Sequence, residues 1–331
     1  MTAQTKKNFV QAINEAIAEA MQADPKVLVL GEDVADPEGG GVVGVTRGLS
    51  TRFGADRVRT TPISEQAIIG AAIGAAIAGY KPVAEIMLMN FTAVAMDMIV
   101  NHAAKLRYMS GGQTTVPIVI RMMTGAGIST GGQHSDYLEA WFAHAPGLKV
   151  VAPSNPADAK GLMLSCIADP DPCMFIECIR TYFAQGEVPD DQAPIPLGKA
   201  KVVQEGTDIT IISYADIFTR SIQAAAELAK EGISVELIDL RTISPWDRET
   251  VLASVRKTGR AVVAHEAVRA FGVGAEIAAT LQEELFGHLK APIQRLGAPY
   301  APVPFSKVLE TAYLVQAADI AAAARVALRT K

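Results

Sequence analysis

The chain has 331 residues, of which 50% are hydrophobic and 20% charged, and its formal net charge is −5. This composition is typical of a compact soluble protein, and the length exceeds what one hydrophobic core usually organises, so we expect two domains. The mild acidity gives no reason to expect nucleic acid or an anionic membrane as a partner.

The N-terminal segment passes directly into a helical pattern, in which Phe9, Ile13, Ile17 and Met21 recur every four residues. No apolar segment with a small-residue cleavage site precedes it, so we expect no secretion signal. The longest run of small apolar residues, 67–79, is too short to cross a bilayer and predicts a buried core helix.

The cysteines are few and match no zinc-binding spacing: Cys166, Cys173 and Cys178. An odd, sparse count is typical of a reducing compartment, with the thiols acting as small buried hydrophobic groups. We therefore expect a cytoplasmic protein.

Strands and helices alternate along the chain. In the first half, strands are expected at 27–30, 83–89 and 116–121, and helices at 67–79 and 93–109. The pattern breaks after Glu177. It restarts with strands at 209–213, 235–238 and 261–264 and with helices at 218–230, 248–257 and 275–285. This alternation predicts parallel sheets covered on both faces.

We therefore predict an α/β protein with two parallel-sheet domains. The segment 186–196 is rich in proline and aspartate and marks the linker. The predicted boundaries are 1–185 for the first domain, 186–197 for the linker and 198–331 for the second domain.

Glu65 is the first candidate for chemistry. It follows Pro62 and Ser64, a plausible helix N-cap, and begins a helix almost devoid of polar groups. A glutamate in the first turn is most often there because the helix dipole favours it. Flanking isoleucines suggest burial instead, and a buried carboxylate with a raised pKa is suited to proton transfer near neutral pH.

His134 lies in a glycine-containing segment, 131–136, that reads as a loop beside a rigid sheet, where functional residues concentrate. The other four histidines have settings that favour structural roles, and no pair has convincing metal-ligand spacing. The glycine clusters match neither a dinucleotide-binding turn nor a phosphate-binding loop, and no serine nucleophile elbow occurs.

An ordered set of motifs resembles one enzyme family over nearly the whole chain. In the first half the set comprises GEDV at 31–34, TPISE at 61–65, EIMLMNF at 85–91, YMSGG at 108–112, QHS at 133–135 and PGLKVV at 146–151. In the second half it comprises DLRT at 239–242, GAEI at 274–277 and PVPF at 302–305. The family is that of beta subunits of thiamine-diphosphate-dependent dehydrogenases of pyruvate, branched-chain 2-oxoacids and acetoin. The resemblance implies a pyrimidine-binding domain followed by a transketolase-like C-terminal domain.

The resemblance implies roles for the matched positions. Glu65 resembles the glutamate that hydrogen-bonds the aminopyrimidine ring of thiamine diphosphate, and Ile63, Met87 and Phe91 resemble the apolar wall against that ring. His134 resembles the histidine that contacts substrate or donates a proton during acyl transfer to lipoamide. Glu32 resembles an acidic residue on the path between paired active sites. Some relatives bind potassium at the positions of Ile118, Cys166, Asp169 and Asp171.

The diphosphate in such enzymes binds through Mg²⁺ held by a Gly-Asp-Gly motif, which this chain lacks. In the family it resembles, that motif belongs to an alpha-type subunit. The resemblance therefore implies an α2β2 heterotetramer with the cofactor at an alpha–beta interface. It also implies a lipoyl-bearing transacylase as a second partner.

The chain departs from the family pattern at two places. Thr60 stands where relatives commonly carry aspartate, and Gly131-Gly132 precede Gln133 where an alanine is expected. Both concern the substrate pocket. The segments 44–49 and 121–127 favour pyruvate or acetoin as the substrate. Pyruvate would be decarboxylated, or acetoin cleaved, before the acyl unit is transferred. The alternatives are a thiamine-dependent carboligase or lyase that uses no lipoamide, and a non-catalytic assembly subunit.

Overall fold

The computed structural model describes residues 4–330, and the chain folds into two compact units. The first unit takes the residues up to Thr124 together with Trp141–Leu197. The second takes Gly125–Ala140 together with the residues from Gly198 onward. The segment Gly125–Ala140 thus lies inside the range predicted for the first domain but packs with the second unit.

A parallel sheet forms the centre of the first unit. Its strands follow the order β6 (Lys149–Val151), β7 (Cys173–Cys178), β5 (Val119–Thr124), β4 (Lys81–Leu88), β2 (Val27–Gly31) and β3 (Val58–Thr60). Every residue of β5 and β7 is buried, as expected for strands covered on both faces. A separate antiparallel pair joins β1 (Gln4–Lys7) to β8 (Gly186–Pro189), so part of the predicted linker is a strand.

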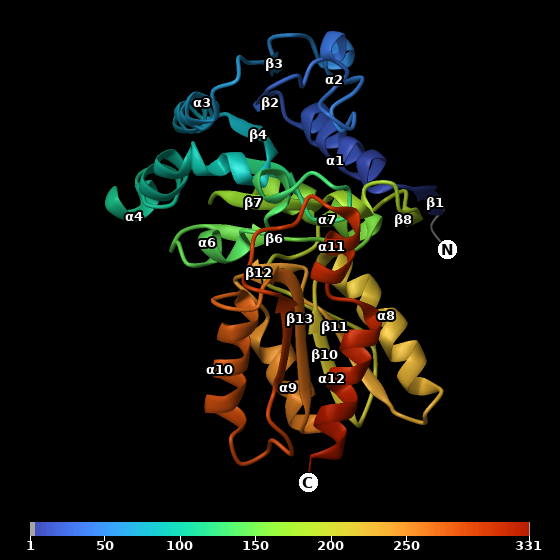
Figure 1. Ribbon diagram of the computed structural model, residues 1–331. Coiled ribbons are helices and arrows are strands. Elements are labelled where there is room, and N and C mark those ends of the chain that lie inside the picture. Colours follow the sequence, from blue (N-terminus) through green and yellow to red (C-terminus); the bar gives the residue numbers. More distant parts are fainter. Residues whose placement is uncertain (1–3, 331) are drawn as a thin grey trace. The chain divides into compact units, whose positions relative to one another are not determined.

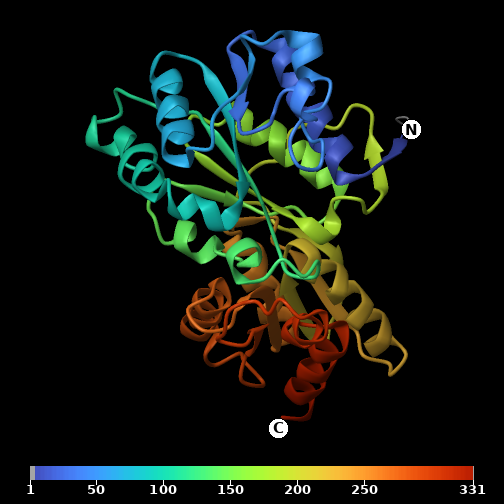
Figure 2. The ribbon, with the colours of Figure 1, turned by 45° about the horizontal axis from the view of Figure 1, so that its top comes forward.

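Helices α1 (Phe9–Ala23) and α7 (Pro156–Ala168) pack on one face of this sheet (Figure 2). The predicted apolar face of α1 is buried, and Asn8 caps the helix in a reciprocal capping box with Gln11. Both helices contribute to one core with the strands, in which residues such as Phe9, Val29 and Phe175 are inaccessible to solvent.

Two predictions for the first unit were wrong in part. Helix α3 (Glu65–Ile77) buries only one face, which includes Ile69 and Ile73, whereas Ala67, Ala71 and Gly74 are exposed. The expected helix 93–109 is interrupted. It consists of the 3₁₀ turn η2 (Met89–Ala93), the π-helical η3 (Met98–Ala103) and α4 (Leu106–Met109), because the Ala104 amide bonds to Ile99, five residues back. The remaining short elements are η1 (Asp36–Glu38), α2 (Leu49–Phe53), α6 (Glu139–Ala143) and η4 (Ile179–Thr181).

The second unit is built on a sheet of order β14 (Gln294–Ala298), β13 (Ala261–Val268), β10 (Ile209–Ser213), β11 (Val235–Asp239) and β9 (Lys201–Gln204). All neighbours are parallel except β9, which closes one edge in the antiparallel direction. Figure 1 shows α8 (Ala215–Ala229) and α12 (Ala317–Arg329) on one face and α9 (Arg248–Thr258) and α10 (Val273–Leu285) on the other. Shorter elements are α5 (Gly132–Ser135), β12 (Thr242–Ser244) and α11 (Lys307–Tyr313).

The strands and helices predicted for 209–285 are all present in this unit, and the α/β fold class is confirmed. The glycine stop signals are confirmed as well. Gly259 ends α9 with φ +77°, and Gly232 adopts the same φ after α8, a backbone conformation that favours glycine.

Candidate active site

The predicted cofactor residues of the first unit lie at or after the carboxyl ends of three neighbouring strands. In the parallel register, Gly31 of β2 lies opposite Thr60 of β3 and Glu85 of β4. The chain continues from these ends into Glu32 and into the segment that leads to Glu65. Ligand sites of open α/β sheets occur at this edge.

Glu65 begins α3 at this edge and is partly buried. Ser64 occupies the N-cap position as predicted, but its side chain makes no capping hydrogen bond. Burial raises the pKa of Glu32, and the nearby carboxylates of Asp33 and Glu65 raise it further. Within residues 4–330 the Glu65 carboxylate has no hydrogen-bond or ion-pair partner, so it is available to a ligand.

The three residues of the predicted apolar wall differ in burial. Met87, in β4, and Phe91, in η2, are partly buried and pack against the core of the first unit. Ile63 is 74% exposed in this chain. The edge therefore carries the carboxylates of Glu32 and Glu65, and β4 and the turn after it carry two apolar side chains, groups whose chemistry suits an aromatic heterocycle with hydrogen-bonding ring atoms.

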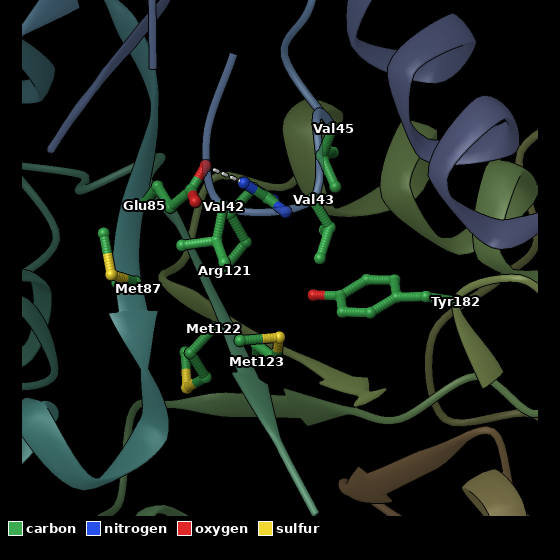
Figure 3. A pocket seen from close by; sticks show the side chains of 9 residues that line it. All are labelled: Val42, Val43, Val45, Glu85, Met87, Arg121, Met122, Met123 and Tyr182. Carbon is green, nitrogen blue, oxygen red and sulfur yellow. Dashed lines mark hydrogen bonds and ion pairs between the residues drawn. The ribbon is translucent and has the colours of Figure 1, made fainter. Parts of the chain in front are cut away.

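A buried charge network lies beneath this edge, and the sequence reading missed it. Arg121 of β5 donates to both oxygens of Glu177 at 2.8 and 2.7 Å and also pairs with Glu85. The Tyr182 hydroxyl donates to Glu177 at 2.6 Å. Figure 3 shows Glu85, Arg121 and Tyr182 converging on one small pocket. Apolar side chains complete its lining: Val42, Val43, Val45, Met87, Met122 and Met123.

Burial and the ion pairs oppose each other in this network. Burial raises the pKa of Glu85 despite the neighbouring Arg121 guanidinium. Burial alone would lower the pKa of Arg121, but Glu177 and Glu85 outweigh that effect and raise it. Isolated charges in otherwise apolar strands, as in Val83–Leu88 and Val119–Met123, were the signal from which this network could have been found.

The glycine-rich loop between β2 and α2 closes over Glu85. A Cβ added at Gly41 would meet a Glu85 carboxylate oxygen at 3.0 Å, and Gly41 has φ +80°. Asp36 anchors this loop, since it accepts hydrogen bonds from Ser50 and Thr51 at 2.6 to 2.8 Å and one from the Gly48 amide. Burial alone would raise the pKa of Asp36, but these hydrogen bonds lower it to about 2.

His134 belongs to the second unit, where it lies in the short helix α5 and is exposed. The hydroxyls of Thr130 and Ser135 bond at 2.7 Å on either side of the turn. Gly131 adopts φ +74°, and a Cβ there would lie 3.3 Å from the Phe305 ring, which accounts for glycine at this position. Glu65 lies in the other unit, so their common role stays a prediction.

The positions predicted for potassium lie in the first unit. Ile118 and Cys166 are buried, and their carbonyl oxygens accept backbone hydrogen bonds from Cys173 and Asp169. Both oxygens of Asp169 accept from Lys149 at 2.6 Å, and Asp171 pairs with Arg107 at 2.7 Å. Because the carboxylates of Asp169 and Asp171 already have cationic partners, a potassium ion here would depend on backbone carbonyls.

Across residues 4–330, no cluster of three or more histidine, cysteine, aspartate or glutamate side chains is arranged to hold a metal ion. None of the helices in the same range has the length and apolarity needed to cross a bilayer.

Comparison with known proteins identifies the domains. Residues 5–183 match the model of the transketolase pyrimidine binding domain, and residues 198–320 match that of the transketolase C-terminal domain. A solved structure described as a split gene transketolase, inactive beta4 tetramer, superposes with a TM-score of 0.81 at 25% identity over 98% of this chain and 99% of that one.

Curated relatives match almost end to end. The beta subunit of acetoin:2,6-dichlorophenolindophenol oxidoreductase from Cupriavidus necator is 48% identical over 97% of both chains. The protein of the same name from Bacillus subtilis is 45% identical over 92% of both, and the pyruvate dehydrogenase E1 beta subunit from Staphylococcus epidermidis is 46% identical over 97% of this chain and 98% of its own. The chain therefore belongs to the family of pyruvate dehydrogenase E1 and acetoin oxidoreductase beta subunits, built from a transketolase pyrimidine-binding domain and a transketolase C-terminal domain.

Proposed function

We propose that this chain is the beta subunit of a thiamine-diphosphate-dependent dehydrogenase that decarboxylates a pyruvate-type 2-oxoacid or cleaves acetoin. The acyl unit passes to a lipoyl group on a transacylase partner. The observation that carries the proposal is the similarity over 97% of the chain to beta subunits named for acetoin and for pyruvate. The two identities, 48% and 46%, do not separate the substrates.

The overall reaction balances for either substrate. A 2-oxoacid loses CO₂, its acyl carbon bonds to one sulfur of the lipoyl disulfide, and the other sulfur takes up a proton. Acetoin instead releases acetaldehyde while its acetyl half is transferred in the same way. When bound, thiamine diphosphate supplies the electron sink that makes bond cleavage next to a carbonyl possible.

Residues of the first unit have the chemistry to hold the cofactor ring. The Glu65 carboxylate would bond a ring nitrogen and hold or release a proton there, and the carboxylate of Glu32 adds negative charge to this edge. Ile63, Met87 and Phe91 would pack against the ring and exclude water from it. His134 would contact the substrate or give a proton during acyl transfer.

An alpha-type partner follows from the same proposal. Mg²⁺ requires oxygen ligands, and we assign them to that partner, because this chain lacks the Gly-Asp-Gly motif. The first unit exposes large apolar side chains that suit a protein interface: Ile63, Tyr108, Met109, Trp141 and Phe183. We propose an α2β2 heterotetramer, and a potassium ion held by backbone carbonyls at Ile118, Cys166, Asp169 and Asp171 belongs to the same proposal.

The decisive experiment is to purify this chain with its alpha-type partner and assay the complex. The assay contains thiamine diphosphate, Mg²⁺, 2,6-dichlorophenolindophenol and, in turn, pyruvate, branched-chain 2-oxoacids and acetoin. We expect cofactor-dependent turnover only when both chains are present, and the preferred substrate identifies the reaction. Turnover by this chain alone would refute the shared site, and no turnover on any substrate would refute the proposed reaction.

A further inference from the structure

The segment Gly125–Ala140, which carries His134, packs with the second unit although the sequence places it between elements of the first. Strand β5 of the first unit ends at Thr124, directly before it. Within the second unit, acidic side chains hold this segment on both sides of His134. These contacts explain why the segment packs with the second unit.

Glu310 of α11 makes the densest set of these contacts. Its carboxylate accepts hydrogen bonds from the amide of Gly127 at 2.6 Å and from the amide of Ser129 at 3.1 and 3.0 Å. The Ser129 hydroxyl donates to it as well, at 3.4 Å. Only 1% of Glu310 is exposed, so these bonds lie out of water, where bonds to a charged acceptor are strong.

Glu266 extends the same arrangement by one residue. It follows His265 in β13, is buried, and accepts a hydrogen bond from the Ala126 amide at 2.8 Å. Three backbone amides of the loop, those of Ala126, Gly127 and Ser129, therefore donate to two carboxylates of the second unit. A small apolar cluster seals the contact, and it comprises Ala126, Ala298, Val303, Tyr313 and Leu314.

Downstream of His134, a third acidic side chain completes the attachment. Glu139 is buried and accepts a hydrogen bond from the Tyr214 hydroxyl at 2.6 Å. Tyr214 precedes α8, which belongs to the second unit. The histidine is therefore exposed between two anchored stretches of chain.

The loop needs this support because its backbone is in an unfavourable conformation. Gly127 has φ +118° and Gly131 has φ +74°. Ser129 adopts φ +60°, a conformation that a residue with a side chain rarely takes without compensating contacts. Its amide is one of the two that bond to Glu310, so removing the carboxylate releases the strained position directly.

We propose that Glu310, assisted by Glu266, is a positioning residue that fixes the loop 126–131 and thereby presents His134 for its reaction. This inference rests on the role proposed for His134. It assigns the second unit a part in the catalytic step. A neutral or shortened side chain at Glu310 leaves the loop amides without their charged acceptor.

The test uses the complex with the alpha-type partner and compares Glu310→Gln, Glu310→Ala, His134→Ala and the double variant Glu310→Ala/His134→Ala. Glu236→Gln is the matched control, because Glu236 is also buried in the second unit and accepts from a backbone amide, that of Gly206, at 3.1 Å. The readouts are kcat, KM, the dissociation constant of thiamine diphosphate, and hydrogen exchange of the loop amides.

We expect Glu310→Ala to lower kcat about tenfold or more, as misplacement of a reacting group does, with cofactor affinity unchanged. Glu310→Gln, which keeps one acceptor oxygen, should retain more activity. In the His134→Ala background the loss from Glu310→Ala should vanish, because the two residues act as a unit. Exchange at 126–131 should rise in Glu310→Ala and stay normal in the control.

Losses that simply multiply in the double variant, or an unchanged kcat in Glu310→Ala, would overturn the proposal. If Glu310→Ala does not fold, the same comparisons are made with Glu310→Gln. An inactive unaltered complex would refute the proposed function instead. Hydrogen exchange would then test the positioning role by itself. Equal exchange of the amides of 126–131 with and without the Glu310 carboxylate would refute that role.

Discussion

Glu32 and Glu65 interact electrostatically: after burial and Asp33, the Glu65 carboxylate further raises the pKa of Glu32. The two side chains come from positions 33 residues apart in sequence, and the parallel pairing of β2 with β3 places their backbones at one sheet edge. Two carboxylates near each other do not ionise independently. Glu65 is the residue proposed to bond the cofactor, and Glu32 is the residue proposed for the path between active sites. Their proximity therefore couples the ionisation of the two.

Glu65→Gln should leave assembly intact and lower turnover by about two to four orders of magnitude, the usual contribution of a proton-transferring group. The amide keeps the size of the side chain but cannot take or hold the proton. The measurement is turnover of the alpha–beta complex at saturating thiamine diphosphate, with Asp56→Asn, an exposed carboxylate of the same unit, as control. Near-normal turnover in Glu65→Gln would remove Glu65 from the mechanism.

The same substitution has an effect that needs no substrate. Because the Glu65 charge contributes to the raised pKa of Glu32, Glu65→Gln should shift the pKa of Glu32 downward, towards 4.5, the ordinary value of a glutamate. Titration of the labelled side-chain carboxyl carbon by NMR measures this shift. An unchanged pKa would show that desolvation and Asp33 alone set it.

His134→Ala should reduce kcat for substrate turnover while the affinity for thiamine diphosphate stays normal. The reason is that His134 belongs to the second unit, whereas the residues proposed to bond the cofactor belong to the first. Isothermal titration with cofactor and steady-state kinetics separate the two properties. His288→Ala, at another exposed histidine of the second unit, is the control. If His134→Ala impaired only assembly with the partner, the histidine would be structural.

Much of the architecture followed from periodicity. The helix that begins at Phe9 and the strands and helices of 209–285 were predictable because each pattern has one dominant period and a clear glycine or polar stop. The fold of the first unit followed from its alternating strands. The exposed face of α3 was not predictable, since alanine and glycine signal close packing equally well against the same chain or a partner.

Individual residues of the candidate site could be predicted from the sequence, but the contacts between them could not. Resemblance supplied Glu65 and His134, whereas the Glu85–Arg121 pair depends on strand register, which a single sequence does not reveal. The attachment of the His134 loop to Glu310 spans 181 to 183 residues. No local pattern marks such a contact, because its donors are backbone amides that every residue carries.

Arg121→Met should destabilise the first unit by about 3–5 kcal/mol, because it leaves the carboxylates of Glu85 and Glu177 buried without their cation. Urea unfolding followed by circular dichroism measures the loss. Arg59→Met is the control, since Arg59 pairs with Asp56 on the surface and should change stability by less than about 1 kcal/mol. Equal stability of the two variants would show that the buried network is energetically neutral.

Glu139 should make stability depend on pH in the opposite sense to an ordinary ion-paired carboxylate. Burial raises its pKa from 4.5 to about 7, and the Tyr214 hydrogen bond only partly opposes this. Below pH 4.5 the side chain is protonated whether the chain is folded or unfolded, so the full stability is present. As pH rises towards 7 the unfolded chain loses the proton and the folded chain retains it, so stability falls, by roughly 3 kcal/mol in total.

Glu139→Gln removes this titration and keeps an acceptor for Tyr214, so its unfolding free energy should vary less between pH 5 and pH 8 than that of the unaltered chain. The comparison is between slopes against pH, because the amide also changes stability by a constant amount that is independent of pH. Glu276→Gln, at an exposed glutamate of α10, should leave the slope as it is. If Glu139→Gln and Glu276→Gln gave the same slope, Glu139 would already be ionised in the folded protein, and its hydrogen bonds to Tyr214 and to the backbone would have to stabilise a buried charge.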